Sequence, residues 1–245
     1  TITDGTNTAT QAITITVTNE NDNTPAFSSA SSFSIAEGTD AVATLAGTDA
    51  DGSTPTFSTT LAGDDAADFT LTEGGDLAFA ATPDFENPVD ANTNNVYSIT
   101  ATITDGTNTA TQAITITVTD ENDNTPALTV ETPYSVAEGV TTVGTVSATD
   151  GDAGTTIVYS LTGTDALDFS INSSTGAITF AATPDFENPV DANTNNEYLL
   201  NVVASDGTNA DTKAIVVNVT NVNDSTPAFS SASSFSIAEG TDAVA

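Results

Sequence analysis

The sequence predicts an all-β fold, built from tandem seven-strand Greek-key sandwiches of the immunoglobulin-like type. Three observations lead to this prediction. Short runs alternate apolar residues with threonine, clusters of Gly, Asp, Asn and Ser separate these runs, and the pattern recurs with a period of 101 residues. No stretch shows the periodicity of an amphipathic helix. The chain is therefore expected to be a string of β modules.

The period is clearest in three proline-ended segments that read as linkers between modules. Pro25, Pro126 and Pro227 are spaced 101 residues apart, and each follows an alternating run that proline cannot continue as a strand ladder. The matching blocks are 1–25 with 102–126 (where only Asn19 against Asp120 differs), 79–95 with 180–196, and 26–43 with 228–245. The expected domains are the end of a preceding repeat at 1–23, whole repeats at 24–124 and 125–225, and the start of a following repeat at 226–245.

Within the first whole repeat, the strands follow from alternating side chains. In the run 111–119, Ile114, Ile116 and Val118 point one way and threonines the other, which suits a sheet with one solvated face. The run 96–104 has the same pattern, and shorter strands are expected at 33–36, 42–46, 56–58, 69–72 and 77–80. The expected core residues are Phe33, Leu45, Phe57, Phe69, Phe79, Tyr97, Ile99, Ile114 and Ile116.

A long polar loop is expected between the last short strand and the run 96–104. Asp90, with Asn92 or Asn94, offers oxygen atoms to a cation there. Hydrogen bonding of the Asx type, from a side chain to the nearby backbone, explains the same residues better.

The charge of the chain is strongly one-sided, with 34 acidic side chains, one basic side chain (Lys213) and a net charge of −33. This charge disfavours binding to nucleic acid and to anionic membranes, and it favours divalent cations as partners; a merely solvated acidic surface is the alternative. The sequence has no run of 18 apolar residues, so it predicts no membrane insertion of this segment. Since His, Cys and Arg are missing, Ser–His triads, thiol catalysis and zinc sites are excluded, and the chain is not expected to be an enzyme.

The acidic residues lie at positions that suit a hard cation. The linker 120–126 carries carboxylates and amides, the oxygen ligands that calcium prefers. Asp84 and Glu86 are two apart on extended chain, so their side chains face the same way. One strand cannot supply the six to eight oxygens that calcium takes, so several loops must converge at the end of a sandwich.

Five short motifs recur in the same order in both whole repeats. In the first repeat they are Ala36-Glu37-Gly38, Asp49-Ala50-Asp51, Asp84-Phe85-Glu86, Asp105-Gly106 and the linker 120–126. In the second they hold Glu138, Asp150 with Asp152, Asp185 with Glu187, Asp206, and the linker 221–227. These motifs, in this order, make both repeats resemble cadherin domains, and the resemblance implies sandwiches of the cadherin type.

The resemblance also implies about three calcium ions at each junction between repeats. At the junction of the whole repeats, the implied ligands are Glu37, Asp84, Glu86, Glu121, Asn122, Asp123, Asn124, Asp150, Asp152 and Asp206, with Glu121 and Asn124 acting through their carbonyl groups. The junction before them would use Asn21, Asp22, Asn23, Asp49, Asp51 and Asp105, and the junction after them Glu138, Asp185, Glu187, Asn223 and Asp224. In the third linker Asn221 replaces Asp120, and this change is expected to weaken the last junction.

Together these features predict a calcium-rigidified stalk or filament region of a large, secreted surface protein that supports cell adhesion or matrix assembly. Cysteine-free β repeats favour a bacterial source. The expected partners are calcium ions, neighbouring repeats of the same chain and sibling chains in a filament. The alternative is an adhesive module that makes homophilic or carbohydrate contacts through one face of a repeat.

Overall fold

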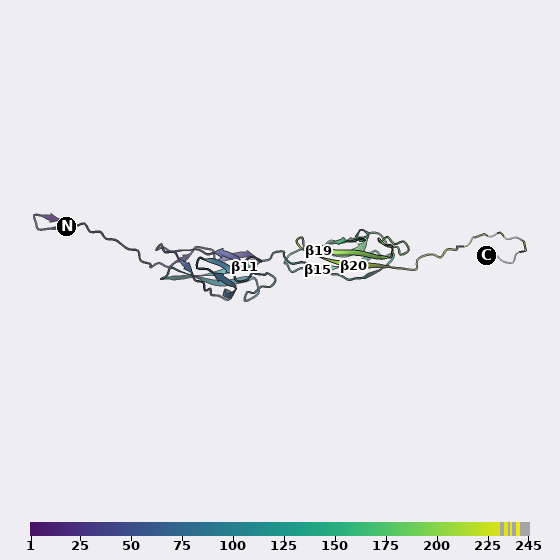
Figure 1. Cartoon of the computed structure of the whole chain (residues 1–245), viewed down its shortest axis with the longest axis horizontal. Helices are drawn as coiled ribbons and strands as arrows, with labels where there is room; N and C mark the ends of the chain where they lie inside the picture. Colours follow the sequence, from purple (N-terminus) through teal and green to yellow (C-terminus); the bar gives the residue numbers. More distant parts are fainter. Residues whose placement is uncertain (231–232, 235, 237–238, 241–245) are drawn as a thin grey trace. The chain divides into compact units, whose positions relative to one another are not determined.

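The computed structural model describes the chain except for residues 231–232, 235, 237–238 and 241–245. It divides into two compact units, Thr1–Asn122 and Asp123–Ala245 (Figure 1). Strands dominate both units, and the helices in the described part are two 3-10 turns, η1 (Ala66–Asp68) and η2 (Ala166–Asp168). In this part of the chain, no helix has the length and apolar character needed to span a membrane. The all-β prediction is confirmed.

The first unit contains a sandwich of two main sheets. The order of the larger sheet is β4-β11-β10-β7, and that of the smaller sheet is β5-β9-β8. Their strands are β4 (Ser32–Ala36), β5 (Ala41–Thr44), β7 (Thr56–Phe57), β8 (Phe69–Leu71), β9 (Asp76–Phe79), β10 (Val96–Thr104) and β11 (Thr109–Thr119). A third ladder pairs β3 (Ala26–Phe27) with β6 (Gly47–Thr48). The seven expected strands are all present, as β4, β5 and β7 to β11, whereas the short strands β3 and β6, which pair with each other, were not expected.

The second unit repeats this arrangement. Its larger sheet has the order β13-β20-β19-β16, and its smaller sheet has the order β14-β18-β17. The strands are β12 (Ala127–Thr129), β13 (Tyr134–Ala137), β14 (Thr142–Thr145), β15 (Ser147–Thr149), β16 (Val158–Thr162), β17 (Phe169–Ile171), β18 (Ala177–Phe180), β19 (Glu197–Ser205) and β20 (Ala210–Thr220). β13 pairs in parallel with β20, as β4 does with β11 in the first unit, and β12 pairs with β15.

The core of each sandwich consists of the inward residues of these strands. In the first unit, Tyr97 is 1% exposed and lies edge-on to Phe69 and Phe79, with ring centroids 5.5 and 5.2 Å away. Ile99 faces Ile114 across β10 and β11, and both are buried. Every expected core residue packs into this cluster, although Phe33 is only half-buried. The period-2 pattern of the sequence therefore locates the core correctly.

The first 25 residues adopt a different structure from their near-identical copy at 102–126. The hairpin of β1 (Ile2–Thr3) and β2 (Thr8–Ala9) keeps the register of the copy, since Ile2 pairs with Ala9 as Ile103 pairs with Ala110. Residues 10–18 form no strand, and Ile15 is 84% exposed. In the copy, the equivalent residues 111–119 pair with β10 along most of their length. The matching start of a following repeat, at 226–245, lies partly outside the described residues.

A buried carboxylate network holds the long loop of each repeat. In the first repeat, Asp65 is 4% exposed and accepts hydrogen bonds from the backbone N–H groups of Ala91 (2.8 Å) and Ser98 (2.6 Å). Asp90 is 2% exposed and accepts from the N–H groups of Asn94 (3.0 Å) and Asn95 (3.1 Å). The Asx interpretation of Asp90 is therefore confirmed, because its oxygens cap the loop backbone.

Asp68, beside this network, makes folding sensitive to pH. Burial raises its pKa, and the charges of Asp65 and Asp90 raise it further. An acid whose pKa is higher in the folded state is costly to keep ionised there. Asp68→Asn is therefore expected to raise the melting temperature at pH 7, and the gain should shrink as the pH falls through the folded-state pKa and vanish below about 3.9.

Thermal unfolding of Asp68→Asn at a series of pH values checks this expectation. Asp64→Asn, at an exposed neighbouring position, is the matched control because it removes the same charge without burial. An equal gain in melting temperature in the two variants would show that the charge of Asp68 does not specifically destabilise the folded state. A gain that does not change with pH would show the same.

Candidate metal centre

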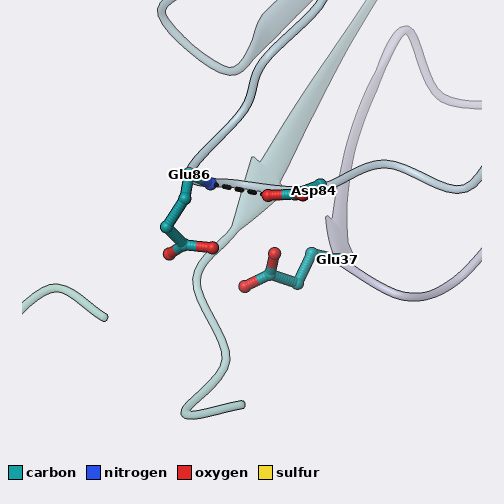
Figure 2. Close-up of side chains that lie close together, drawn as sticks. All are labelled: Glu37, Asp84 and Glu86. Carbon is teal, nitrogen blue, oxygen red and sulfur yellow. Dashed lines mark hydrogen bonds between the residues drawn. The ribbon is translucent and has the colours of Figure 1, made fainter. Parts of the chain in front are cut away.

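The first acidic group lies at the end of β4 and contains Glu37, Asp84 and Glu86. Each side chain has a carboxylate oxygen within 4.8 Å of one from each of the other two. Figure 2 shows Glu37 and Glu86 directed toward one another, with Asp84 beside them. The Asp84 carboxylate accepts from the N–H of Glu86 (3.1 Å), which keeps both side chains on one side of the turn.

Glu37 connects this group to the linker that follows the repeat. It is 7% exposed, and its two carboxylate oxygens accept from the N–H groups of Phe85 (2.6 Å) and Glu121 (2.9 Å). Glu37 directly follows β4, Phe85 lies in the loop after β9, and Glu121 lies in the segment after β11. Glu37 therefore joins three segments that are far apart in the sequence.

The same arrangement recurs in the second unit with Glu138, Asp185 and Glu187, whose oxygens also lie within 4.8 Å of one another. The N–H of Val222 (2.6 Å) and the N–H of Phe186 (2.8 Å) donate to Glu138 and hold its pKa below the usual range. One difference is that the Asn221 amide donates to Glu187 (2.7 Å). An amide that occupies a carboxylate oxygen would compete with a cation for it.

A second type of acidic group lies at the opposite end of the sandwich. In the second unit it contains Asp150, Asp152 and Asp206, again with oxygens within 4.8 Å of one another. Asp152 is 5% exposed and accepts from the backbone N–H (3.1 Å) and the side-chain amide (2.7 Å) of Asn124. Asn209 donates its amide to the Asn124 carbonyl (2.9 Å). The end of the linker is thus fixed to this group.

In the first unit the equivalent residues hold the first linker in the same way. Asp51 accepts from the backbone N–H (2.7 Å) and the amide (2.5 Å) of Asn23, and the Asp49 carboxylate accepts from the N–H of Asp51 (2.8 Å). The backbone N–H of Asn108 donates a hydrogen bond to Asp105 and is the main cause that lowers the pKa of this carboxyl group. The side-chain amide of Asn108 donates to the Asn23 carbonyl (2.8 Å). Buried oxygens without a hydrogen-bond partner remain on Asn21, Asp49 and Asp105.

Two asparagines of these sites, Asn108 and Asn209, were not among the expected ligands. They position the linker by binding the carbonyl groups of Asn23 and Asn124. The sequence contains a signal for them, because the tetrapeptide Asp-Gly-Thr-Asn recurs at 4–7, 105–108 and 206–209. Asp105 and Asp206 start this turn by accepting hydrogen bonds from the N–H groups at its third and fourth positions.

The remaining expected ligands lie in the linker segments. Asn122 ends the first unit and Asp123 begins the second. Asp22 is exposed and accepts from the amide of Asn23 (3.2 Å). Asn223 and Asp224 are also exposed, and Asp224 donates its N–H to the Val222 carbonyl (2.8 Å) without joining the group at Glu138.

The chemistry of these groups suits a hard divalent cation. Their side-chain donors are carboxylate and amide oxygens, which calcium and magnesium bind in preference to softer metals. Two unit charges 4.8 Å apart repel by about 0.9 kcal/mol even in the dielectric of bulk water. A cation would relieve this repulsion and would also satisfy the unpartnered buried oxygens. The residues present therefore fit a calcium ion.

Comparison with known proteins supports the same family. Residues 132–220 match the model of the cadherin domain. The chain is 41% identical over 131 residues to human cadherin EGF LAG seven-pass G-type receptor 2, and 40% identical over 152 residues to the Drosophila protocadherin-like wing polarity protein stan. These matches cover 50% and 55% of the chain but only 4% of each relative. Both relatives are animal proteins, so the expected bacterial source gains no support.

Solved structures show the same fold. Human protocadherin-24 EC1-2 superposes with a TM-score of 0.67 at 21% identity, over 83% of this chain and 100% of that one. Drosophila N-cadherin EC1-4 gives a TM-score of 0.63 at 24% identity, over 81% of this chain and 50% of that one. Residues 132–220 are therefore similar to a cadherin domain, and both units share the sandwich fold of these solved structures.

Proposed function

We propose that this segment is an extracellular stalk of cadherin-like repeats, which calcium makes stiff. One observation carries the proposal: acidic groups lie at both ends of a repeat, and each one holds linker backbone. Glu37 accepts from the N–H of Glu121, and Asp152 accepts from the N–H of Asn124, only three residues further along the chain. Ions bound at these groups would restrain the linker at both of its ends.

The energetics of the proposal follow from like charges. Each group gathers three carboxylates with no basic side chain, since the one Lys of the chain, Lys213, forms its ion pair with Asp211. Without a cation, this repulsion favours separation of the segments that carry the charges. With calcium bound, the same segments become ligands of one ion, and about three ions per junction are expected to hold the linker in a single conformation. Adhesion or matrix assembly would then depend on calcium through the stiffness of the stalk.

The proposal also covers the domain boundaries and the cellular location. Whole repeats at 24–124 and 125–225 would be the units of the stalk, and the ligands would be the residues predicted from the sequence. The animal relatives carry cadherin in their names, and the cadherin domain supports an extracellular, non-enzymatic role at the cell surface. The chain spans about 4% of the length of these relatives.

Small-angle X-ray scattering of the chain in calcium and in excess chelator tests the proposal. We expect the maximum dimension of the chain to rise in calcium, because the linker 120–126 becomes rigid. For the same reason, the range of overall conformations that fits the scattering curve should narrow. Asp123→Ala should abolish this rise, whereas Glu197→Gln, which removes an exposed charge from a strand outside the acidic groups, should preserve it. The same maximum dimension in both conditions would show that the acidic groups are not ion sites.

A further inference from the structure

A small recess occurs at the same place in both repeats, beside the 3-10 turn. In the second repeat it has a volume of about 230 Å³, and its mostly apolar lining includes Leu167, Asp168, Phe180, Pro184, Val190 and Tyr198. Its counterpart in the first repeat has a volume of about 210 Å³ and is lined in part by Asp68, Phe79 and Tyr97. The recurrence follows from the sequence, because the segments 79–95 and 180–196, which supply much of the lining, are identical.

The walls of the recess are fixed by backbone hydrogen bonds and by the core. The N–H of Ala181, directly after β18, donates to the carbonyl group of Asp168 in η2 at 2.7 Å, as Ala80 does to Asp68 in the first repeat. The rings of Phe180 and Tyr198 are buried and pack edge-on against each other, with centroids 5.3 Å apart. The recess is therefore part of the folded repeat, and a ligand does not have to open it.

One acidic side chain of this lining, Asp168, has no partner. Its carboxylate is half-buried, and none of the described residues donates a hydrogen bond to it or forms an ion pair with it. The nearby acids Asp165 and Asp191, in contrast, accept from backbone N–H groups, for example those of Leu199 (2.7 Å) and Asn195 (2.9 Å). Burial raises the pKa of Asp168, and the charges of Asp165 and Asp191 raise it further. A positive group in the recess would relieve this cost.

The lining favours an organic cation over a metal ion or a neutral ligand. Calcium takes about six to eight oxygen ligands, whereas the first recess offers one carboxylate, Asp68, among apolar side chains. A neutral apolar ligand would cover the carboxylate without pairing it, which is costly. A guanidinium group avoids both problems, because it is weakly hydrated and its planar shape binds a carboxylate through two parallel hydrogen bonds.

The cation has to come from another molecule. This chain carries a charge of −33, and its one basic side chain, Lys213, lies 3.9 Å from Asp211. Two side chains of the second recess are strongly exposed, Leu167 at 95% and Val190 at 68%. They would contact the residues on either side of an inserted arginine. A protein segment that carries arginine therefore fits the recess better than a free small molecule does.

We propose that each recess binds one exposed arginine side chain of a basic partner protein. The guanidinium group would pair with Asp168, or with Asp68 in the first repeat, and the arginine stem would lie against the apolar lining. Leu167 would add a contact that the first recess lacks, because Ala67 stands at the equivalent position. The second recess is therefore expected to bind the more tightly of the two. The proposal does not depend on calcium, since neither Asp68 nor Asp168 belongs to the acidic groups described above.

An NMR titration of the whole chain, in calcium and in chelator, tests the proposal. The probe is the acetylated and amidated peptide Gly-Leu-Arg-Leu-Gly, and the matched probe replaces arginine by citrulline, which keeps its shape without its charge. We expect saturable shifts of the backbone amides of Ala181, Ala182 and Tyr198, with a Kd on the order of 1 mM. The citrulline peptide should bind at least about tenfold more weakly. Because each amide reports its own site, binding elsewhere on this acidic chain is recognised separately.

Three variants of the chain make the test specific to the recess. Asp168→Asn should raise the Kd of the second recess at least about fivefold and leave the first recess unchanged. Leu167→Ala, which gives the second repeat the residue of the first, should lower its affinity to that of the first recess. Glu197→Gln, which removes an exposed charge of β19 that does not line the recess, should bind as the wild type does.

Several results would overturn the proposal. One is the absence of saturable shifts at the recess up to the solubility limit of the arginine peptide. Another is an equal Kd for the arginine and citrulline peptides, or an unchanged Kd in Asp168→Asn, since either would show that the carboxylate does not hold the ligand. Finally, acetyl-arginine amide that binds as tightly as the peptide would show that the recess takes a small guanidinium compound, which contradicts a partner protein as the occupant.

Discussion

In saturating calcium, the chain is expected to unfold about 10–20 °C above its melting temperature in excess chelator. A ligand at 100 times its Kd stabilises the folded state by about 2.7 kcal/mol for one site. Each kcal/mol raises the melting temperature of a domain of this size by about 4–8 °C. Thermal unfolding followed by circular dichroism in the two solutions measures the difference. Equal melting temperatures would contradict the calcium assignment.

One substitution makes this expectation specific to the predicted ligands. Asp206→Asn keeps an oxygen that can accept from the N–H groups of Thr208 and Asn209, both at 2.7 Å, but it removes the negative charge. We expect the variant to lose at least half of the calcium-induced rise in the melting temperature of the second repeat. In chelator it should be as stable as the wild type or more stable, because repulsion from Asp150 and Asp152 is relieved. Glu197→Gln, the charge-matched control at an exposed position, should behave as the wild type in both solutions.

Tyr198→Ala is expected to destabilise the second repeat by about 3–5 kcal/mol and to leave the first repeat unaffected. The Tyr198 ring is 1% exposed and lies 5.4 Å from Phe169 and 5.3 Å from Phe180, between ring centroids. Its removal leaves a cavity that the surrounding strands can close only in part. The first repeat has its own cluster around Tyr97, and the two clusters share no residue.

Differential scanning calorimetry in chelator separates the two repeats. In Tyr198→Ala, the melting temperature of the second repeat should fall by about 15–30 °C, while that of the first repeat should stay the same. Tyr198→Phe, which keeps the ring in the same place, should shift that transition by only a few degrees. A single transition that falls as a whole would show that the repeats do not unfold independently and would contradict the proposed domain boundaries.

Local pattern was sufficient to predict the sandwich. The alternation in 96–104 and 111–119 identifies the two longest strands and the inward positions of Tyr97, Ile99 and Ile114. Strand periodicity is a local property, because successive side chains must face opposite sides of the sheet. The linkers and paired carboxylates could be recognised in the same way, since each motif spans only a few residues.

The sequence could not show which backbone groups the acidic residues hold. Glu37 accepts from the N–H of Glu121, which lies 84 positions later, and Asp65 accepts from the N–H of Ser98, 33 positions later. These partners meet because the loops converge at the ends of the sheets, and no periodicity records that convergence. For the same reason, Asn209 was missed as the residue that fixes the Asn124 carbonyl.

The sequence by itself determined the strand pattern, the repeat and the composition of the acidic groups, whereas tertiary structure decided whether a strand-forming sequence becomes a strand. Residues 10–18 and 111–119 are identical, yet Ile15 is 84% exposed and Ile116 is fully buried. Strand β11 pairs with β10 on one side and with β4 on the other, and residues 10–18 have neither neighbour. A strand needs hydrogen bonds and cover from distant parts of the chain, because its own residues cannot satisfy its backbone.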